Sequence, residues 1–189
     1  MKRSLLAFVR LTGEEAGAKS HSVSLHQNLL GKSILQLTVE AVQSLGPEKI
    51  LAVSGAGDEQ NDGSFLPLGV EWLQTGKIAG VFTAVDSGKD WLVRHPSKNL
   101  VVLDARLAVL SPRTLRSLLL AHQKKKNSLT VAVGAAGTGS LPVFVAKIRD
   151  LLEATDKLDR PDKTRGGIDD LIRVMAEMGK QTGFYRARR

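Results

Sequence analysis

The sequence has no cysteine and few aromatic residues. Because none of its 189 residues is a cysteine, disulfides, thiol chemistry and zinc sites with cysteine ligands are excluded. The four histidines show no metal-ligand spacing, so a zinc or haem enzyme is not expected. Aromatic residues make up only 4% of the chain, which gives little support for binding a nucleic acid by stacking of its bases.

Long apolar runs are also missing. No run approaches the roughly 18 apolar residues that a bilayer span needs. The apolar residues after Met1-Lys2-Arg3 are interrupted at Arg10, which makes them too short for a secretory signal. With 42% hydrophobic and 24% charged residues, the composition is typical of one globular domain. We therefore expect a soluble cytoplasmic protein without membrane contact.

Positive charge exceeds negative charge. Lys and Arg number 27 and Asp and Glu number 19, so the formal net charge is +8. The two basic clusters are Lys124-Lys125-Lys126 and Arg186-Ala187-Arg188-Arg189. Such clusters suit a phosphate-binding surface or an acidic partner, although a lysine run at a helix end also complements the helix dipole. Binding of nucleic acid therefore stays open as a second class of function.

Apolar strands and helices alternate along the chain. The predicted strands are 4–9, 49–54, 70–73, 99–104, 128–133, 141–146 and 182–187, and the predicted helices are 32–45, 76–85, one that begins after Ser111, 147–155 and 168–179. Ser111-Pro112 is the clearest helix start, with an N-cap serine followed by proline. Continuous apolar strands are typical of a parallel sheet covered on both faces. We predict an α/β fold, a three-layer α/β/α sandwich with a mostly parallel sheet and a ligand crevice at the carboxyl ends of its strands.

The connection between the first strand and the first helix is long. It runs from Leu11 to Lys32, whereas about 2–6 residues are usual in an α/β unit. Gly13, Gly17 and Lys19 supply part of a phosphate cradle, in which backbone N–H groups and a cation hold an anion. Glu14-Glu15 in the same turn would repel a triphosphate. Both a cradle and an ordinary surface loop stay open at this point.

Four stretches, in order along the chain, resemble the sugar-1-phosphate nucleotidyltransferases, and in particular the uridylyltransferase domain that makes UDP-N-acetylglucosamine. They are Gly31-Lys32-Ser33-Ile34-Leu35 with the helix and strand after it, residues 72–77, residues 101–119 and residues 167–180. Each stretch is weakly specific alone, and the resemblance depends on their shared order over most of the chain. It implies a fold of the nucleotidyltransferase (GT-A/Rossmann-like) type, with one nucleotidyltransferase-like domain over residues 1–189 and a reduced acceptor lobe.

The resemblance also implies site residues. Residues 72–77 are similar to a nucleotide-contacting Leu-Gly-Thr-Gly-His stretch, which makes Thr75, Gly76 and Lys77 candidate nucleotide-binding residues together with Gly13. Asp104-Ala105-Arg106 is similar to a contracted form of the Asp-Ala-Ala-Arg stretch of related cytidylyltransferases. By this resemblance, Asp104 is a candidate ligand for Mg²⁺.

Several catalytic positions of the family are changed. The family's Leu-Ala-Ala-Gly-x-Gly-Thr-Arg loop falls on residues 10–17, and only its first glycine is kept, at Gly13. The arginine that would hold the triphosphate falls on Gly17, and the Pro-Lys pair after it is also missing, so Lys19 is the remaining weak candidate for a catalytic cation. The magnesium-binding aspartate falls on Arg106.

These changes affect catalysis more than binding. Nucleotidyl transfer relies on positioning and on charge stabilisation, and the loss of several contacts at about 2–4 kcal/mol each would eliminate useful turnover. We therefore expect a catalytically degenerate nucleotidyltransferase-like protein, a pseudoenzyme that binds a nucleotide or nucleotide-sugar or serves as a regulatory module for a protein partner. Two alternatives stay open: an active enzyme that converts an NTP and a sugar-1-phosphate to an NDP-sugar and pyrophosphate, and a basic nucleic-acid-binding protein.

Overall fold

The computed structural model describes residues 5–11, 28–29, 31–55, 69–76, 80–95, 99–105, 111–134, 140–157 and 167–187. Seven of its strands form one sheet. They are β1 (Leu5–Leu11), β4 (Lys49–Ser54), β5 (Val70–Gln74), β6 (Asn99–Asp104), β7 (Leu129–Val133), β8 (Ser140–Lys147) and β9 (Thr182–Arg186). Two further strands, β2 (Asn28–Leu29) and β3 (Lys32–Ser33), pair with each other in a short antiparallel ladder.

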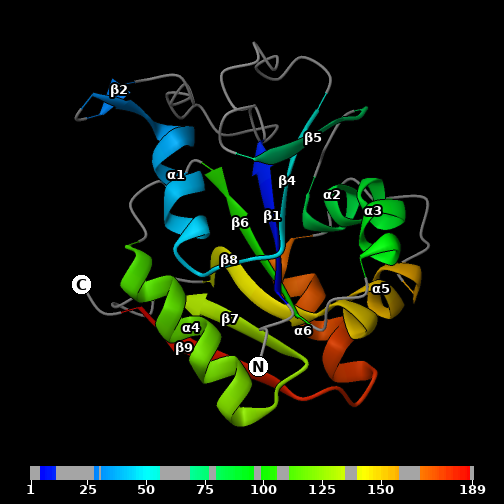
Figure 1. Ribbon diagram of the computed structural model, residues 1–189. Coiled ribbons are helices and arrows are strands. Elements are labelled where there is room, and N and C mark those ends of the chain that lie inside the picture. The colour runs from blue at the N-terminus through cyan, green and yellow to red at the C-terminus, as the bar shows by residue number, and fades with distance from the viewer. Residues whose placement is uncertain are drawn as a thin grey trace, which may run out of the picture.

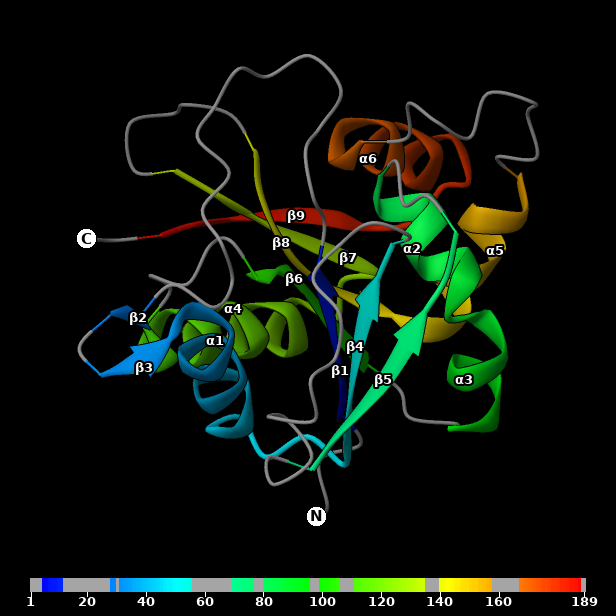
Figure 2. The same cartoon turned by 90° about the horizontal axis from the view of Figure 1, so that it is seen from above.

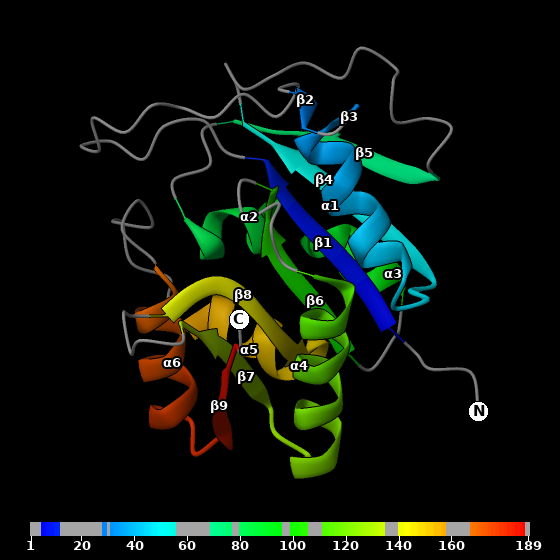
Figure 3. The ribbon, with the colours of Figure 1, turned by 90° about the vertical axis from the view of Figure 1, so that its left-hand side faces the viewer.

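The sheet is mostly parallel, as the sequence predicts. Its strand order is β5-β4-β1-β6-β8-β7-β9, with β5 and β4 at one end and β7 and β9 at the other (Figure 3). The strands β5, β4, β1 and β6 run in one direction, and β7 and β9 are parallel to each other. Strand β8 runs antiparallel to both β6 and β7. The carboxyl ends of four neighbouring strands therefore meet at one edge of the sheet.

Helices cover both faces of the sheet. They are α1 (Ile34–Gln43), α2 (Val81–Ser87), α3 (Lys89–Arg94), α4 (Pro112–Lys125), α5 (Ile148–Lys157) and α6 (Ile168–Glu177). Helices α1 and α4 lie on one face, and α2, α3, α5 and α6 lie on the other (Figure 1, Figure 2). The predicted three-layer α/β/α sandwich is therefore confirmed.

The core consists of two apolar layers separated by the sheet. All seven residues of β1 are buried, and its side chains alternate between the layers. Leu5 and Val9 join the cluster beneath α1 and α4, while Leu6 and Phe8 join the cluster beneath the other helices. The continuous apolar run of this strand thus reflects burial on both faces, as expected for a central parallel strand.

The helix cap predicted at Ser111 is confirmed. Its hydroxyl accepts a hydrogen bond from the backbone N–H of Thr114 at 3.2 Å. The hydroxyl of Ser33 does the same for α1, where it accepts from the N–H of Gln36 at 3.1 Å. Each side chain satisfies one of the N–H groups that a helix leaves without an internal partner.

The prediction of a helix that begins at Gly76 is wrong. Gly76 is a bend, and α2 begins at Val81, because the backbone N–H of Thr75 still continues the sheet by donating to the carbonyl of Ser54 at 2.9 Å. Helix α3, six residues long, was not predicted. No helix in the described ranges is both long and apolar enough to cross a bilayer.

Candidate functional site

The candidate site is the sheet edge at which β5, β4, β1 and β6 end. Parallel strands bring their carboxyl ends to the same edge, which is the usual ligand crevice of open α/β sheets. The described residues there are the last residues of the four strands and the few that follow them. They form the floor of the site.

A buried ion pair occupies the centre of this edge. Arg10 on β1 and Asp104 on β6 are register partners on adjacent strands. The Arg10 Nη2 atom lies 2.7 Å from Asp104 Oδ2, and the two side chains are only 6% and 3% exposed. Both project to the face covered by α2, because they alternate with residues that belong to the opposite apolar layer. The guanidinium neutralises the carboxylate in a region that excludes water.

Polar contacts join the ends of β4 and β5. The indole N–H of Trp72 donates to the hydroxyl of Ser54 at 3.1 Å. Beyond β5, the hydroxyl of Thr75 donates to the hydroxyl of Ser87, at the end of α2, at 3.2 Å. These bonds fix the position of Thr75 relative to both the sheet and the helix.

Helix α1 also reaches this edge. The hydroxyl of Thr38 lies 2.9 Å from the carbonyl of Ile34 and 3.2 Å from the carbonyl of Ala105, the residue after β6. Helix α1 is the first helix after β1 along the chain, and Ser33 caps its N-terminus. The positive end of a helix dipole therefore adds to the electrostatics of this part of the molecule.

The structure places three of the predicted site residues on this edge. Thr75 and Gly76 follow β5, and Asp104 ends β6. Two strands lie between β5 and β6, so at about 4.8 Å per strand these groups are roughly 14 Å apart. They share one edge of the sheet without direct contact. Gly13, Lys19 and Lys77 lie outside the described residues.

The described residues do not by themselves make a magnesium site. No group of three or more His, Asp or Glu side chains with the spacing of a metal site occurs among them. The Asp104 carboxylate already faces a cation, the Arg10 guanidinium. Magnesium at Asp104 therefore stays a prediction, and it would require this guanidinium to move aside or to share the carboxylate with the ion.

Arg10 is the functional feature that the sequence analysis did not assign. It is the one charged residue in an otherwise apolar, fully buried strand. A charge in such a position requires a partner, because an isolated ion is costly to remove from water. Asp104, the one charged residue of the equally apolar β6, was the available partner.

Comparisons with known proteins agree with this fold. No protein-family model matches the sequence. The chain is 25% identical, over 195 aligned residues, to the bifunctional protein GlmU of Rhizorhabdus wittichii, a match that covers 94% of this chain and 42% of GlmU. A nucleotidyl transferase from Methanothermobacter thermautotrophicus superposes with a TM-score of 0.71 at 18% identity, over 98% of this chain and 88% of the other. The chain has the nucleotidyltransferase fold.

A second solved structure supports the same nucleotidyltransferase fold. The CMP:2-keto-3-deoxy-manno-octonic acid synthetase, solved in complex with CTP, has a TM-score of 0.68 at 11% identity and covers 97% of this chain and 89% of its own. The nucleotidyltransferase fold that the resemblance implies is therefore confirmed. The chain spans about two fifths of the length of the curated relative, GlmU.

Proposed function

We propose that this nucleotidyltransferase-like protein binds a nucleotide or a nucleotide-sugar at the carboxyl edge of its sheet and has lost most of its catalytic power. One observation carries the proposal: the central carboxylate of this edge, Asp104, is neutralised by Arg10 at 2.7 Å. A carboxylate held in this way is a poor ligand for a cation that must stabilise a leaving pyrophosphate.

Support for nucleotide binding comes from the fold, and support for weakened catalysis comes from the replaced positions in the sequence. A solved structure with this fold holds CTP, and a second is a nucleotidyl transferase. In this chain, the loop positions that supply cations in the resembled family are replaced, while a glycine and a threonine remain after β5 at Gly76 and Thr75. Binding requires fewer positioned charges than turnover, so binding is expected to outlast catalysis.

The decisive experiment is thermal unfolding with UTP, CTP, GTP, ATP and UDP-N-acetylglucosamine, each with and without Mg²⁺. A ligand at 100 times its dissociation constant adds about 2.7 kcal/mol of stability. We expect a rise in melting temperature that does not need Mg²⁺. We also expect no release of pyrophosphate when sugar-1-phosphates are added. Release of pyrophosphate would instead establish the active transferase, and no shift with any ligand would overturn the nucleotide site.

Gly76 offers a matched pair of variants for the same assay. It is exposed, its φ lies outside the left-handed region, and a Cβ added there meets no atom of the described residues within 4 Å. Gly76→Asn and Gly76→Asp therefore differ mainly in charge. If a nucleotide phosphate lies beside Gly76, the aspartate variant loses the ligand-induced shift and the asparagine variant keeps more of it. Equal shifts would place the nucleotide elsewhere.

The same samples test the nucleic-acid alternative. Binding to generic oligonucleotides would weaken steeply with salt, because counterions are released from the phosphate backbone. A nucleotide-specific shift that persists at moderate salt favours the proposed function. A strong salt slope with oligonucleotides and no nucleotide shift would favour the basic nucleic-acid-binding protein.

A further inference from the structure

A pocket lies at the edge of the sheet opposite the candidate site. Its volume is about 700 Å³, within the range of small-molecule sites. Its walls include Asn99, the first residue of β6, whereas Asp104 is the last residue of that strand. At about 3.3 Å per residue, five steps along β6 separate the two edges by roughly 17 Å. The pocket is therefore distinct from the candidate nucleotide crevice.

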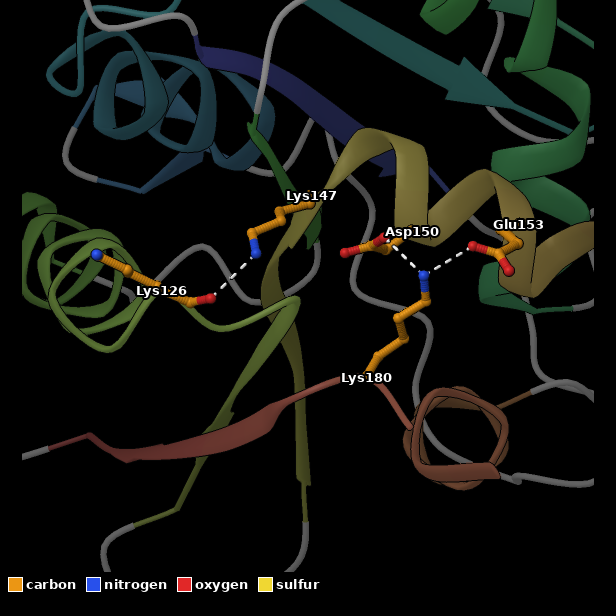
Figure 4. A network of polar contacts seen from close by, with 5 residues as sticks. All are labelled: Lys126, Lys147, Asp150, Glu153 and Lys180. Atoms are coloured by element: carbon orange, nitrogen blue, oxygen red, sulfur yellow. Dashed lines mark hydrogen bonds and ion pairs between the residues drawn. The ribbon is translucent and has the colours of Figure 1, made fainter. Parts of the chain in front are cut away.

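The charges around this pocket favour an anion. Lys126, Lys147 and Arg149 line it, and among the described residues Asp150 is the one lining carboxylate. Lys147 donates to the backbone carbonyl of Lys126 at 3.0 Å, and the Lys126 ammonium points away from it (Figure 4). Within the part of the chain that the structure describes, Lys147 makes no ion pair with a carboxylate. Its charge is left to act on the pocket.

Asp150 does not cancel these cations, because it is already paired. Lys180 donates to its Oδ1 at 3.0 Å and to Glu153 Oε2 at 2.8 Å (Figure 4). Burial by itself would raise the pKa of Asp150, but hydrogen bonds from Ser128 and Lys180 and the nearby lysine charges hold it below its ordinary value. Helix α5 also begins at the pocket wall, so the positive end of its dipole adds to the attraction for an anion.

A chain of hydrogen bonds with a fixed direction joins three lining residues, Asn99, His122 and Asn127, through Thr130. Asn99 Oδ1 can only accept, so the Nε2–H of His122 donates to it at 3.2 Å. The ring is neutral, because burial and then the charge of Lys147 lower its pKa to about 4. Its Nδ1 therefore accepts from the hydroxyl of Thr130 at 3.0 Å. The Thr130 oxygen in turn accepts from Asn127 Nδ2 at 3.0 Å.

This chain ends in a buried acceptor that no described residue satisfies. Asn127 lines the pocket and is 1% exposed, and its Oδ1 has no hydrogen-bond partner among the described residues. If the amide rotated, its oxygen would face the oxygen of Thr130, whose proton is already donated to His122 Nδ1. A buried acceptor left without a donor is unfavourable. The oxygen exposes less than 1 Å² of surface, so a ligand hydroxyl relieves that cost only when the amide turns toward the pocket.

We propose that this pocket binds a small phosphorylated polyol, with the phosphate at Lys147, Arg149 and the start of α5 and a hydroxyl donated to Asn127 Oδ1. The cations account for the phosphate, and the unsatisfied amide oxygen accounts for the hydroxyl. A phosphorylated sugar carries both groups on one small molecule. The site is independent of the nucleotide crevice and stands whether or not the proposed function is correct.

Titration calorimetry tests this with three probes: ribose 5-phosphate, ribose and inorganic phosphate. Ribose 5-phosphate is expected to bind saturably, inorganic phosphate at least tenfold more weakly, and ribose not measurably. Equal binding of phosphate and ribose 5-phosphate would overturn the role of Asn127. Absence of binding by ribose 5-phosphate would overturn the site as a whole.

Variants locate the binding. Arg149 is exposed, so Arg149→Gln removes its charge with little risk to folding. Lys147 is the last residue of β8, and comparison of Lys147→Met with Lys147→Arg separates the effect of its charge from that of its packing. We expect at least a tenfold loss for Arg149→Gln and for Lys147→Met, and near-normal binding for Lys147→Arg. Lys125→Met, at the exposed end of α4 outside the pocket, is the matched control and should bind normally.

A spectroscopic signal separates this site from the nucleotide crevice. Ribose 5-phosphate should shift the side-chain amide resonances of Asn127 and the ring nitrogens of His122, since both belong to the same hydrogen-bond chain. The Lys147→Met variant should keep any nucleotide-induced thermal shift. The sugar phosphate binds elsewhere if Arg149→Gln and Lys147→Met still bind it and the amide resonances of Asn127 do not shift.

Discussion

The guanidinium of Arg10 and the carboxylate of Asp104 meet at 2.7 Å at the carboxyl edge of the sheet, on two adjacent parallel inner strands, and both are almost fully buried. Removal of two opposite charges from water is costly, and their attraction offsets that cost only when both are present. Each residue therefore explains why the other is tolerated. The pair also gives the candidate crevice a neutral floor where a bare carboxylate would repel phosphates.

Replacement of Arg10 tests this dependence. Arg10→Met removes the cation that neutralises Asp104 and should lower the free energy of unfolding by about 3–5 kcal/mol. The double variant Arg10→Met/Asp104→Leu removes both charges and should recover most of that loss, because apolar residues often replace a buried ion pair without net cost. Urea unfolding measures both.

The exposed pair of Arg173 and Asp170 supplies the control. Its side chains are 51% and 37% exposed, although the distance is again 2.7 Å. Arg173→Met should cost no more than about 1 kcal/mol, because solvent screens exposed pairs. A loss in Arg10→Met as small as in Arg173→Met would contradict the buried-pair argument.

Gly88, between α2 and α3, leaves room for the ring of Phe8. A Cβ at this position would lie 2.6 Å from Phe8 Cε2, and Phe8 is fully buried. Gly88→Ala should therefore destabilise the fold by about 1–3 kcal/mol through overpacking. Gly76→Ala, with open space around it, should stay within about 0.5 kcal/mol of the parent. Thermal unfolding of both variants decides the point, and equal melting temperatures would refute it.

Much of the fold could be predicted because the strand signals are strong. The bounds predicted for β4 and β6 are those of the structure, since each is an apolar run closed by polar residues. The antiparallel direction of β8 could not be predicted, because a strand buried on both faces has the same pattern in either direction. Helix α3 was missed since six residues are too few to show a helical period.

The candidate site could be predicted only in part. Thr75, Gly76 and Asp104 all lie at the carboxyl edge of the sheet, because parallel strands end together. Their role in binding stays a prediction. The pairing of Arg10 with Asp104 depends on which strands are neighbours, and the strand order is set by crossovers that the sequence pattern does not specify. A single opposite charge in each of two apolar strands was nevertheless a usable signal.

The cap at Ser111 is a feature that the sequence predicts and the structure confirms. Its hydroxyl accepts from the Thr114 N–H, so Ser111→Ala should cost about 1 kcal/mol, whereas Ser111→Asp should keep the cap. Ser117→Ala, inside the same helix, should be neutral or slightly stabilising because alanine favours helices. Urea unfolding compares the three, and a Ser111→Ala variant as stable as Ser117→Ala would argue against a capping role.

His122 makes the stability of the protein depend on pH. Burial, and next the charge of Lys147, lower its pKa from the ordinary value of 6.5 to about 4. Between these two values the unfolded chain binds a proton that the folded chain does not, so stability falls as the pH falls through this window. Each pKa unit corresponds to about 1.4 kcal/mol, which gives a loss of roughly 2 kcal/mol between pH 7 and pH 5.

Urea unfolding at pH 7 and pH 5 measures this effect above the range in which most carboxylates titrate. The parent protein should lose roughly 2 kcal/mol of unfolding free energy between these two pH values. His122→Gln, although less stable overall because the hydrogen bonds to Asn99 and Thr130 change, should lose much less over the same interval. The control is His95→Gln, at the end of α3 on the face of the sheet opposite α4. This variant should lose as much unfolding free energy as the parent protein. An equal loss in the parent and in His122→Gln would show that another group carries the pH dependence and that the ring of His122 is not held neutral by its surroundings.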